Sequence, residues 1–316
     1  MSKKIKNACM TLALAAVVGV SAAASACTVQ SKHPNARITV EFNSEIYEID
    51  YTLYRNMYPQ TVQHFIELAD SGFYNDTIVH DYKSSDWVAG AYGYDDAETV
   101  GYVASYGRSA MAEYLENHCK EKEYYDTVTA GIKSGEFSAS VFTKYIYNDK
   151  GEEIVSVDDA LPTLIGEFKD NGHKIEGDKG LTSTYGTLKM VYYKKDIKPV
   201  FVENSFGQIL PRDYHNNCAT SLFSLQVSNS TLYDSSKYAV FGQLKNDGAK
   251  DALEDLTDAI SDYASSVSSN SKFTTTVATQ VDKEDKFADE GGREIDASFT
   301  MVSMPLIIRK VVITKY

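Results

Sequence analysis

The chain has 316 residues, and its 31 lysines and arginines stand against 44 aspartates and glutamates, which gives a net charge of −13. This excess of acid argues against proteins that bind nucleic acid or anionic lipid through a basic surface. The length is enough for one large domain with long insertions or for two small domains.

The N-terminus has the pattern of a secretory signal peptide. Three lysines within the first six residues precede an apolar run over 10–23, and Ala-Ser-Ala comes directly before Cys27. We expect residues 1–26 to be removed, which lowers the net charge from −13 to −16. A cysteine at this place is typical of a lipoprotein, in which lipid on Cys27 holds the chain on the extracytoplasmic side of the membrane. Ordinary cleavage after the same Ala-Ser-Ala would instead release a secreted protein.

A short tether and a hairpin are predicted next. Residues 27–36 are polar and contain a proline, which is typical of a tether between an anchor and a domain. Apolar and polar residues alternate over 37–42 and again over 47–53, which predicts two strands of a hairpin. A helix is predicted from Pro59 to about residue 71, because apolar residues recur there at spacings of three and four.

The remaining chain is predicted to be mainly β. Strands are predicted at 77–80, 87–91, 141–147, 186–193, 221–227, 238–244 and 306–313, and a second helix at 251–263. Segment 97–164 differs in character and is interpreted as an insertion, and 194–217 and 264–304 as expanded loops. This order predicts one domain over 37–316, built as a closed antiparallel barrel with a helix over each open end.

Five segments, in chain order, resemble the cyclophilin family of peptidyl-prolyl cis–trans isomerases. They are ITVEF with YPQTVQHFIELADSGFYNDTIVHDY over 38–42 and 58–82, GEFKDNG at 166–172, GTLKM at 186–190, KYAVFGQL at 237–244, and the closing strand over 305–313. The resemblance implies an eight-stranded closed barrel capped by two helices, with 97–164 as a large α/β insertion. It also implies an isomerase that acts on exported chains as they fold.

The resemblance also identifies the positions that should catalyse. Rotation about an X-Pro bond faces a barrier of roughly 18–20 kcal/mol, and the family lowers it with an Arg that donates to the prolyl nitrogen and with Gln and Asn side chains that hold the backbone. At the Arg position this chain has Asp81, and at the two Gln positions it has Gly90 and Leu222. Loss of one such donor costs about 2.7–4 kcal/mol. We therefore expect isomerase activity to be weak or lost, unless Lys83 or Arg212 supplies the missing cation.

The peptide-binding groove implied by the resemblance keeps apolar and aromatic character. Its positions are Trp87, Val88, Val191, Tyr192, Ser224, Leu232, Tyr233 and Tyr238. Trp87 is expected to form an aromatic wall. An isomerase is one interpretation, and a non-catalytic surface lipoprotein that binds extended or Pro-containing peptides or a protein partner is the alternative. In a third interpretation, the functional residues lie in the insertion 97–164, and the barrel serves only as a scaffold.

No cofactor or metal is expected. The six histidines have none of the spacings of a zinc site. Cys119 and Cys218 form a candidate disulfide in an oxidising compartment, with two separate thiols as the alternative. We expect a monomer whose partners are exported or Pro-containing polypeptides and, through Cys27, the membrane, but no nucleic acid.

Overall fold

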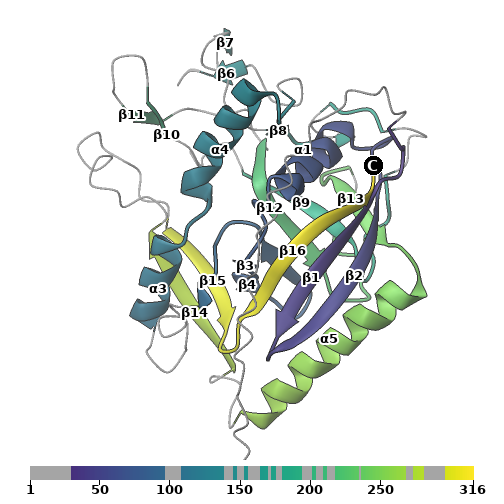
Figure 1. Cartoon of the computed structure of the whole chain (residues 1–316), viewed down its shortest axis with the longest axis vertical. Helices are drawn as coiled ribbons and strands as arrows, with labels where there is room; N and C mark the ends of the chain where they lie inside the picture. The colour runs from purple at the N-terminus through teal and green to yellow at the C-terminus, as the bar shows by residue number, and fades with distance from the viewer. Residues whose placement is uncertain are drawn as a thin grey trace, which may run out of the picture. The chain divides into compact units, whose positions relative to one another are not determined.

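The computed structural model describes residues 30–96, 108–138, 145–147, 153–155, 164–169, 172–175, 180–193, 201–203, 209–211, 218–234, 236–267, 273–280 and 296–316. The described residues from Ser31 to Tyr316 belong to one compact unit and are drawn in colour in Figure 1. The predicted signal sequence over 1–26 and the predicted lipid site Cys27 lie outside the described residues. In the part of the chain that is described, no helix combines the length and the apolar character needed to cross a bilayer.

The centre of the fold is one strongly curled antiparallel sheet (Figure 1). Its strands are β1 (Asn35–Phe42), β2 (Glu45–Leu53), β3 (Thr77–Ile78), β4 (Asp81–Tyr82), β5 (Asp86–Ala89), β8 (Leu164–Ile165), β9 (Leu188–Tyr193), β12 (Cys218–Gln226), β13 (Val240–Leu244) and β16 (Leu306–Lys315). Nine of them follow one path in the order β3-β16-β1-β2-β13-β9-β12-β5-β4, and β8 pairs with β12. The mainly β class is confirmed, but the path has nine strands where eight were predicted. The difference arises because segment 77–82 divides into β3, which pairs with β16, and β4, which pairs with β5.

The first hairpin shows why these sequences form strands. Alternate residues of β1 are buried, and Ile38 lies opposite the equally buried Ile49 of β2. Asn43 and Ser44 form the turn, both with positive φ. A two-residue turn of this kind matches the twist of the flanking strands. The hairpin therefore places one apolar face of each strand against the same core.

Helix α1 (Pro59–Asp70) is fixed at its start by a distant carboxylate. Pro59 occupies the first turn, where its missing N–H costs no hydrogen bond. The backbone N–H groups of Gln60 and Thr61 donate to Glu167, at 3.1 and 2.7 Å. Glu167 belongs to the segment GEFKDNG. One role of that segment is therefore to cap α1.

Helix α5 (Asp247–Ser266) covers the sheet at β2 (Figure 1). The side chain of Asn246 accepts a hydrogen bond of 2.9 Å from the N–H of Ala249, which caps the helix. Leu253, Leu256 and Ile260 are buried on one side, as predicted. The helix is longer than the predicted 251–263 because this cap lies well before the first apolar position.

The predicted insertion and loops contain regular structure. Segment 97–164 includes α3 (Arg108–Asn117), α4 (Glu121–Ser134), β6 (Tyr145–Tyr147) and β7 (Glu153–Val155), and segment 194–217 includes β10 (Phe201–Glu203) and β11 (Ile209–Pro211). Segment 264–304, predicted as a loop, includes β14 (Thr274–Gln280) and β15 (Asp296–Val302), which pair as antiparallel strands. Helix α3 packs on β14, and β15 packs on β4 (Figure 1).

Apolar side chains form two separate cores. The main core lies inside the curled sheet and includes Phe65 of α1 and Phe223 of β12. A second core consists of Ile78, Ala91, Tyr92, Met111, Tyr114, Leu115, Cys119, Leu222, Val277, Met301 and Ile307. Leu222 adjoins Phe223 in β12, and successive strand residues point to opposite faces. The second core therefore lies on the outer face of the sheet, beneath α3 and the β14–β15 hairpin.

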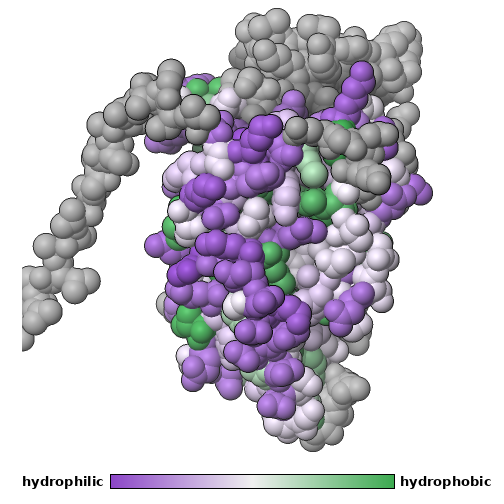
Figure 2. Space-filling view, turned by 90° about the vertical axis from the view of Figure 1, so that its right-hand side faces the viewer, coloured by the Kyte–Doolittle hydropathy of each residue, from purple (hydrophilic) through white to green (hydrophobic). Residues whose placement is uncertain are grey.

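The side of the unit that carries α5 and β2 is mainly hydrophilic. Figure 2 shows this side, where apolar residues form small separate areas between polar ones. This pattern is typical of a surface exposed to solvent.

Candidate functional site

Four residues form a row across the outer face of the sheet. Asp81 of β4 pairs with Val88 of β5, Val88 pairs with Ser224 of β12, and Ser224 pairs with Lys189 of β9. Side chains of directly paired residues project to the same face. Phe223, next to Ser224, projects into the main core. The row from Asp81 to Lys189 therefore lies on the outer face, where the resemblance implies the proline groove.

Asp81, which the resemblance places at the position of the family Arg, forms a hydrogen bond with Thr300 and an ion pair with Lys83. Its Oδ1 accepts a hydrogen bond of 3.1 Å from the backbone N–H of Thr300 in β15. Its Oδ2 lies 2.6 Å from Nζ of Lys83. Asp81 thus fastens the β14–β15 hairpin to the sheet edge, and Lys83, one candidate for a replacement cation, is paired with it. The other candidate, Arg212, lies outside the described residues.

Gly90, at the first Gln position, leaves no room for a side chain. Its φ is +95°, and a Cβ there would lie 2.6 Å from the carbonyl oxygen of Ser221. The Ser221 hydroxyl donates to the carbonyl of Gly90 at 2.7 Å, and the Tyr74 hydroxyl donates to the carbonyl of Ser221 at 3.1 Å. Close approach of two backbones favours glycine. The packing of β12 against this residue therefore excludes the glutamine itself.

Leu222, at the second Gln position, is part of the second core. It is buried in the same cluster as Met111 of α3 and Met301 of β15. Val88 and Val191, two predicted groove residues, pack against this cluster. Helix α3 and the β14–β15 hairpin therefore cover the part of the outer face where the resemblance implies an open groove.

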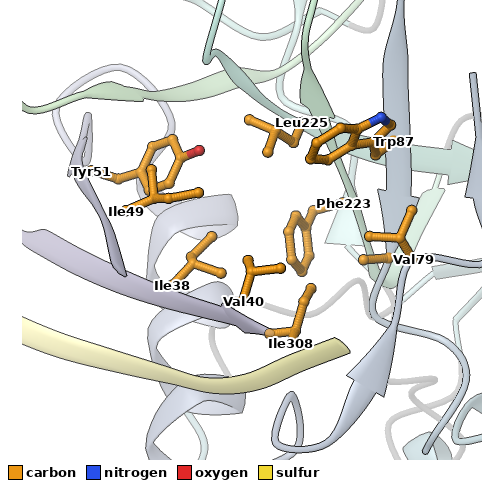
Figure 3. A pocket seen from close by; sticks show the side chains of 10 residues that line it. Ile38, Val40, Ile49, Tyr51, Val79, Trp87, Phe223, Leu225 and Ile308 are labelled. Carbon is orange, nitrogen blue, oxygen red and sulfur yellow. The ribbon is translucent and has the colours of Figure 1, made fainter. Parts of the chain in front are cut away.

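Trp87 does not line the groove, so the prediction of an aromatic wall is wrong. Its neighbour Val88 belongs to the outer row, and alternation along β5 therefore turns Trp87 inward. It is buried in the main core beside a cavity of about 20 Å³, which holds at most a water-sized molecule. The cavity (Figure 3) is also lined by Ile38, Val40, Ile49, Tyr51, Val79, Ala89, Phe223, Leu225 and Ile308.

An aromatic row lies beside the covered part of the face. We define it as Phe168, Tyr192, Tyr238 and Tyr233, whose successive ring centroids are 4.9, 5.6 and 5.2 Å apart. Tyr192 and Tyr238 are half-buried, and Leu232 is 37% exposed. The three tyrosines and Leu232 are predicted groove residues. Phe168 was not predicted, although its place in GEFKDNG marked the segment.

Lys189, where the aromatic row ends, is absent from the residues predicted from the sequence. Its Nζ lies 3.6 Å from the ring centroid of Tyr233 and 4.7 Å from that of Tyr238. Burial lowers the pKa of Lys189 to about 8, although the negative charge of Asp86 acts in the opposite direction. The alternation in GTLKM could have indicated an outward lysine, because Leu188 and Met190 belong to the main core.

The hydroxyl of Tyr233 connects this lysine site to β5 and β12. It donates a hydrogen bond of 2.7 Å to Oδ2 of Asp86 and lies 3.4 Å from the hydroxyl of Ser224. Burial of the ring raises the pKa of Tyr233, and the hydrogen bond to Asp86 acts in the same direction. Tyr233 therefore remains a neutral hydrogen-bond donor at physiological pH.

The candidate disulfide stays a prediction. Cys119 is buried in the second core, whereas the side chain of Cys218 lies outside the described residues. In the described ranges, no three or more His, Cys, Asp and Glu side chains are grouped so that they could hold a metal ion.

Residues 37–280 match the family model described as cyclophilin type peptidyl-prolyl cis-trans isomerase/CLD. The chain is also similar to the cyclophilin type peptidyl-prolyl cis-trans isomerase of Cryptosporidium parvum, with 13% identity, coverage of 90% of this chain and 99% of that one, and a TM-score of 0.38. For the Mimivirus cyclophilin the identity is 13%, the coverage 91% and 92%, and the TM-score 0.37. No curated protein sequence matches the chain. Because the family model spans most of the sequence, the chain belongs to the cyclophilin-type peptidyl-prolyl cis–trans isomerase family.

Proposed function

We propose that this protein is a member of the family without isomerase activity, which is exported and binds extended polypeptides along the aromatic row. One observation is the main support for the proposed loss of catalysis. The residue at the position of the catalytic Arg is Asp81, and its carboxylate is bonded to the hairpin that covers the surrounding face.

The chemistry of the substituted positions supports this loss. A catalyst of X-Pro rotation must stabilise the twisted amide more than the planar one, and the family does so with a donor to the nitrogen. An ionised Asp81 can only accept hydrogen bonds. Gly90 has no side chain, and Leu222 has no polar group. Since one missing donor lowers a rate by roughly a hundred- to a thousandfold, the combined loss leaves no measurable catalysis.

The aromatic row supports polypeptide binding. In an extended chain, every second side chain lies on the same face, with a rise of roughly 3.3 Å per residue. The half-buried rings of Tyr192 and Tyr238, whose centroids are 5.6 Å apart, therefore offer neighbouring contacts to same-side groups of such a chain, which lie about 6.6 Å apart. Tyrosine side chains suit this role because they combine a rigid apolar surface with a polar edge.

We further propose that the sheet closes into the barrel of the family. Support comes from segment 77–82, whose backbone forms hydrogen bonds with β16 near one end of the strand path and with β5 near the other end. The N–H of Val79 donates to the carbonyl of Leu306 in β16, and the N–H of His80 donates to that of Val88 in β5, both at 3.0 Å.

Export and anchoring through Cys27 rest on the lysines, the apolar run and Ala-Ser-Ala-Cys at the N-terminus. Cells expressing the protein can be labelled with radioactive palmitate. The native chain should incorporate label and the Cys27→Ser variant should not. Equal incorporation by both would remove the anchor from the proposal.

The loss of catalysis is tested with a chromogenic peptide whose Ala-Pro bond must be trans before chymotrypsin cleaves it. The purified protein should leave the isomerisation rate at its uncatalysed value. Asp81→Arg should also give no acceleration, because the new side chain would lose the bond to Thr300 under a covered face. A clear acceleration by the native protein would overturn the proposal in favour of an active isomerase.

Binding is tested by fluorescence anisotropy with a dye-labelled, uncharged decapeptide. Tyr238→Ala should weaken binding, because it removes the ring that joins Tyr192 to Tyr233. Tyr316→Ala is the matched control, since Tyr316 is an exposed tyrosine outside the aromatic row. Equal affinity of the native protein and Tyr238→Ala would refute binding at this surface.

A further inference from the structure

Lys189 is a buried cation, and no described residue supplies a counter-ion to it. Only 8% of the residue is exposed, and none of the residues that the structure describes forms an ion pair or a hydrogen bond with its ammonium group. Burial of an ammonium group is unfavourable unless hydrogen bonds and an opposite charge replace its water. The rings of Tyr233 and Tyr238 stabilise the cation in part. Its three N–H groups nevertheless remain available to a further acceptor.

Asp86, whose charge acts on Lys189, is hydrogen-bonded to other groups. Asp86 accepts hydrogen bonds from the hydroxyls of Tyr233, at 2.7 Å, and Ser85, at 2.9 Å. Its charge favours the protonated form of Lys189, whereas Lys83 acts against that form. Asp86 thus affects the lysine electrostatically without occupying its donors.

The surroundings of Lys189 differ from a pocket for a proline ring. Ser224, directly paired with Lys189, is a polar residue at one of the predicted groove positions. The hydroxyls of Ser224 and Tyr233 lie 3.4 Å apart. This end of the aromatic row therefore combines an ammonium group with hydroxyl groups, all partly shielded from water. Such a combination favours an anion with two acceptor oxygens over an apolar ring.

We infer that Lys189 makes this end of the aromatic row a binding site for a carboxylate group of the bound polypeptide. The inference deepens the proposed function and rests on it. The carboxylate can belong to an acidic side chain or to a chain terminus, and both present the same two oxygens. The protein carries an excess of acidic residues, so this cation distinguishes the end of the aromatic row from a chain that is acidic on average.

Three dye-labelled decapeptides of otherwise equal sequence test this inference by anisotropy. One is uncharged with an amidated C-terminus, one has a single central Glu and an amidated C-terminus, and one is uncharged with a free C-terminal carboxylate. The native protein should bind at least one carboxylate peptide about tenfold more tightly than the uncharged peptide. The peptide with the larger advantage identifies the source of the carboxylate.

Lys189→Met should abolish this advantage, so that the variant binds the three peptides with equal affinity. The substitution replaces a buried cation by an apolar chain of similar length, so we expect it to fold, and Lys189→Gln provides a second neutral variant. Lys237→Met is the matched control, because Lys237 is an exposed lysine beside Tyr238 in the sequence. It should retain the advantage.

The outcomes separate the inference from the proposed function. Equal affinity of the native protein for all three peptides, or an advantage that persists in both Lys189 variants, overturns the carboxylate site but leaves polypeptide binding intact. Failure of all three peptides to bind overturns both.

Discussion

The backbone N–H of Thr300 donates a hydrogen bond to the carboxylate of Asp81, with 3.1 Å between the nitrogen and Oδ1. Asp81 lies in β4 at the end of the curled sheet, and Thr300 lies in β15 of the covering hairpin. The resemblance to the family implies that a side chain at the position of Asp81 faces the substrate. Here the same position connects two structural elements, so this residue serves the fold.

Replacement of Asp81 by Ala should destabilise the protein by about 1–3 kcal/mol, because the Thr300 N–H loses a charged acceptor in a partly buried place. Asp81→Asn should lose less, since its side-chain oxygen can still accept. Urea unfolding measures both changes, and amide hydrogen exchange at Thr300 reports the local effect. Asp234→Ala is the control at an exposed aspartate. If Asp81→Ala matches the native stability, the bond does not hold the hairpin.

Gly90→Ala should be strongly destabilising, because the new Cβ would lie 2.6 Å from a backbone oxygen at a residue with φ of +95°. Gly135→Ala is a matched control, since Gly135 has φ of +83° but a Cβ added there would meet no atom within 4 Å. The control should lose about 1–3 kcal/mol from backbone strain, and Gly90→Ala should lose clearly more. Thermal and urea unfolding compare the two variants. Equal losses would mean that the approach of β12 adds no constraint.

Local patterns predicted the elements that bury one face against the main core. The alternation over 37–42 and 47–53 predicted β1 and β2, and apolar spacing from Pro59 predicted α1 to within about one residue. These predictions succeed because alternation and helical periodicity are properties of adjacent residues.

The candidate site depends on contacts between distant segments, which a single sequence does not contain. Trp87 was assigned to the wrong face because the direction of every β5 side chain depends on a register of one residue. Lys189 became a candidate only when Tyr233 and Tyr238, from a later segment, were found around it. The hydrophobic pattern of the sequence likewise did not predict that α3 and the β14–β15 hairpin cover the outer face, because these contacts join segments that are far apart in the chain.

The segment predicted as an insertion is integrated into the packing. Its helix α3 contributes Met111 and Leu115 to the second core, and α4 contributes Tyr124 and Val128 to the main core. Deletion of 97–164 would therefore expose apolar surface of the sheet. This argues against the interpretation of the barrel as an independent scaffold for that segment.

Acid should destabilise the protein through His80. Burial lowers the pKa of His80 to about 4, below its ordinary 6.5. Between these values the unfolded chain binds a proton that the folded chain does not, so stability falls as the pH falls. His80→Phe keeps an aromatic ring between Tyr92 and Phe299 and removes the titrating group. Between pH 7 and 5 this variant should lose roughly 1–2 kcal/mol less than the native protein in urea unfolding. Identical pH dependence of the two proteins would rule out a buried neutral His80.

Alkaline pH should stabilise the ligand-free native protein relative to Lys189→Met. Burial lowers the pKa of Lys189 from 10.5 to about 8, so between these values only the unfolded chain binds the proton, and folding becomes more favourable as the pH rises. At pH 7 the variant should therefore be the more stable protein, by up to about 3 kcal/mol.

Urea unfolding at pH 7, 9 and 10 measures this difference, which should shrink towards pH 10, while Lys237→Met should show no such trend. A difference that stays constant would mean that the two tyrosine rings stabilise the ammonium as well as water does. The ammonium group of Lys189 would then be as stable in the folded protein as in water. A carboxylate ligand would not be needed to stabilise it, which would contradict the proposed site.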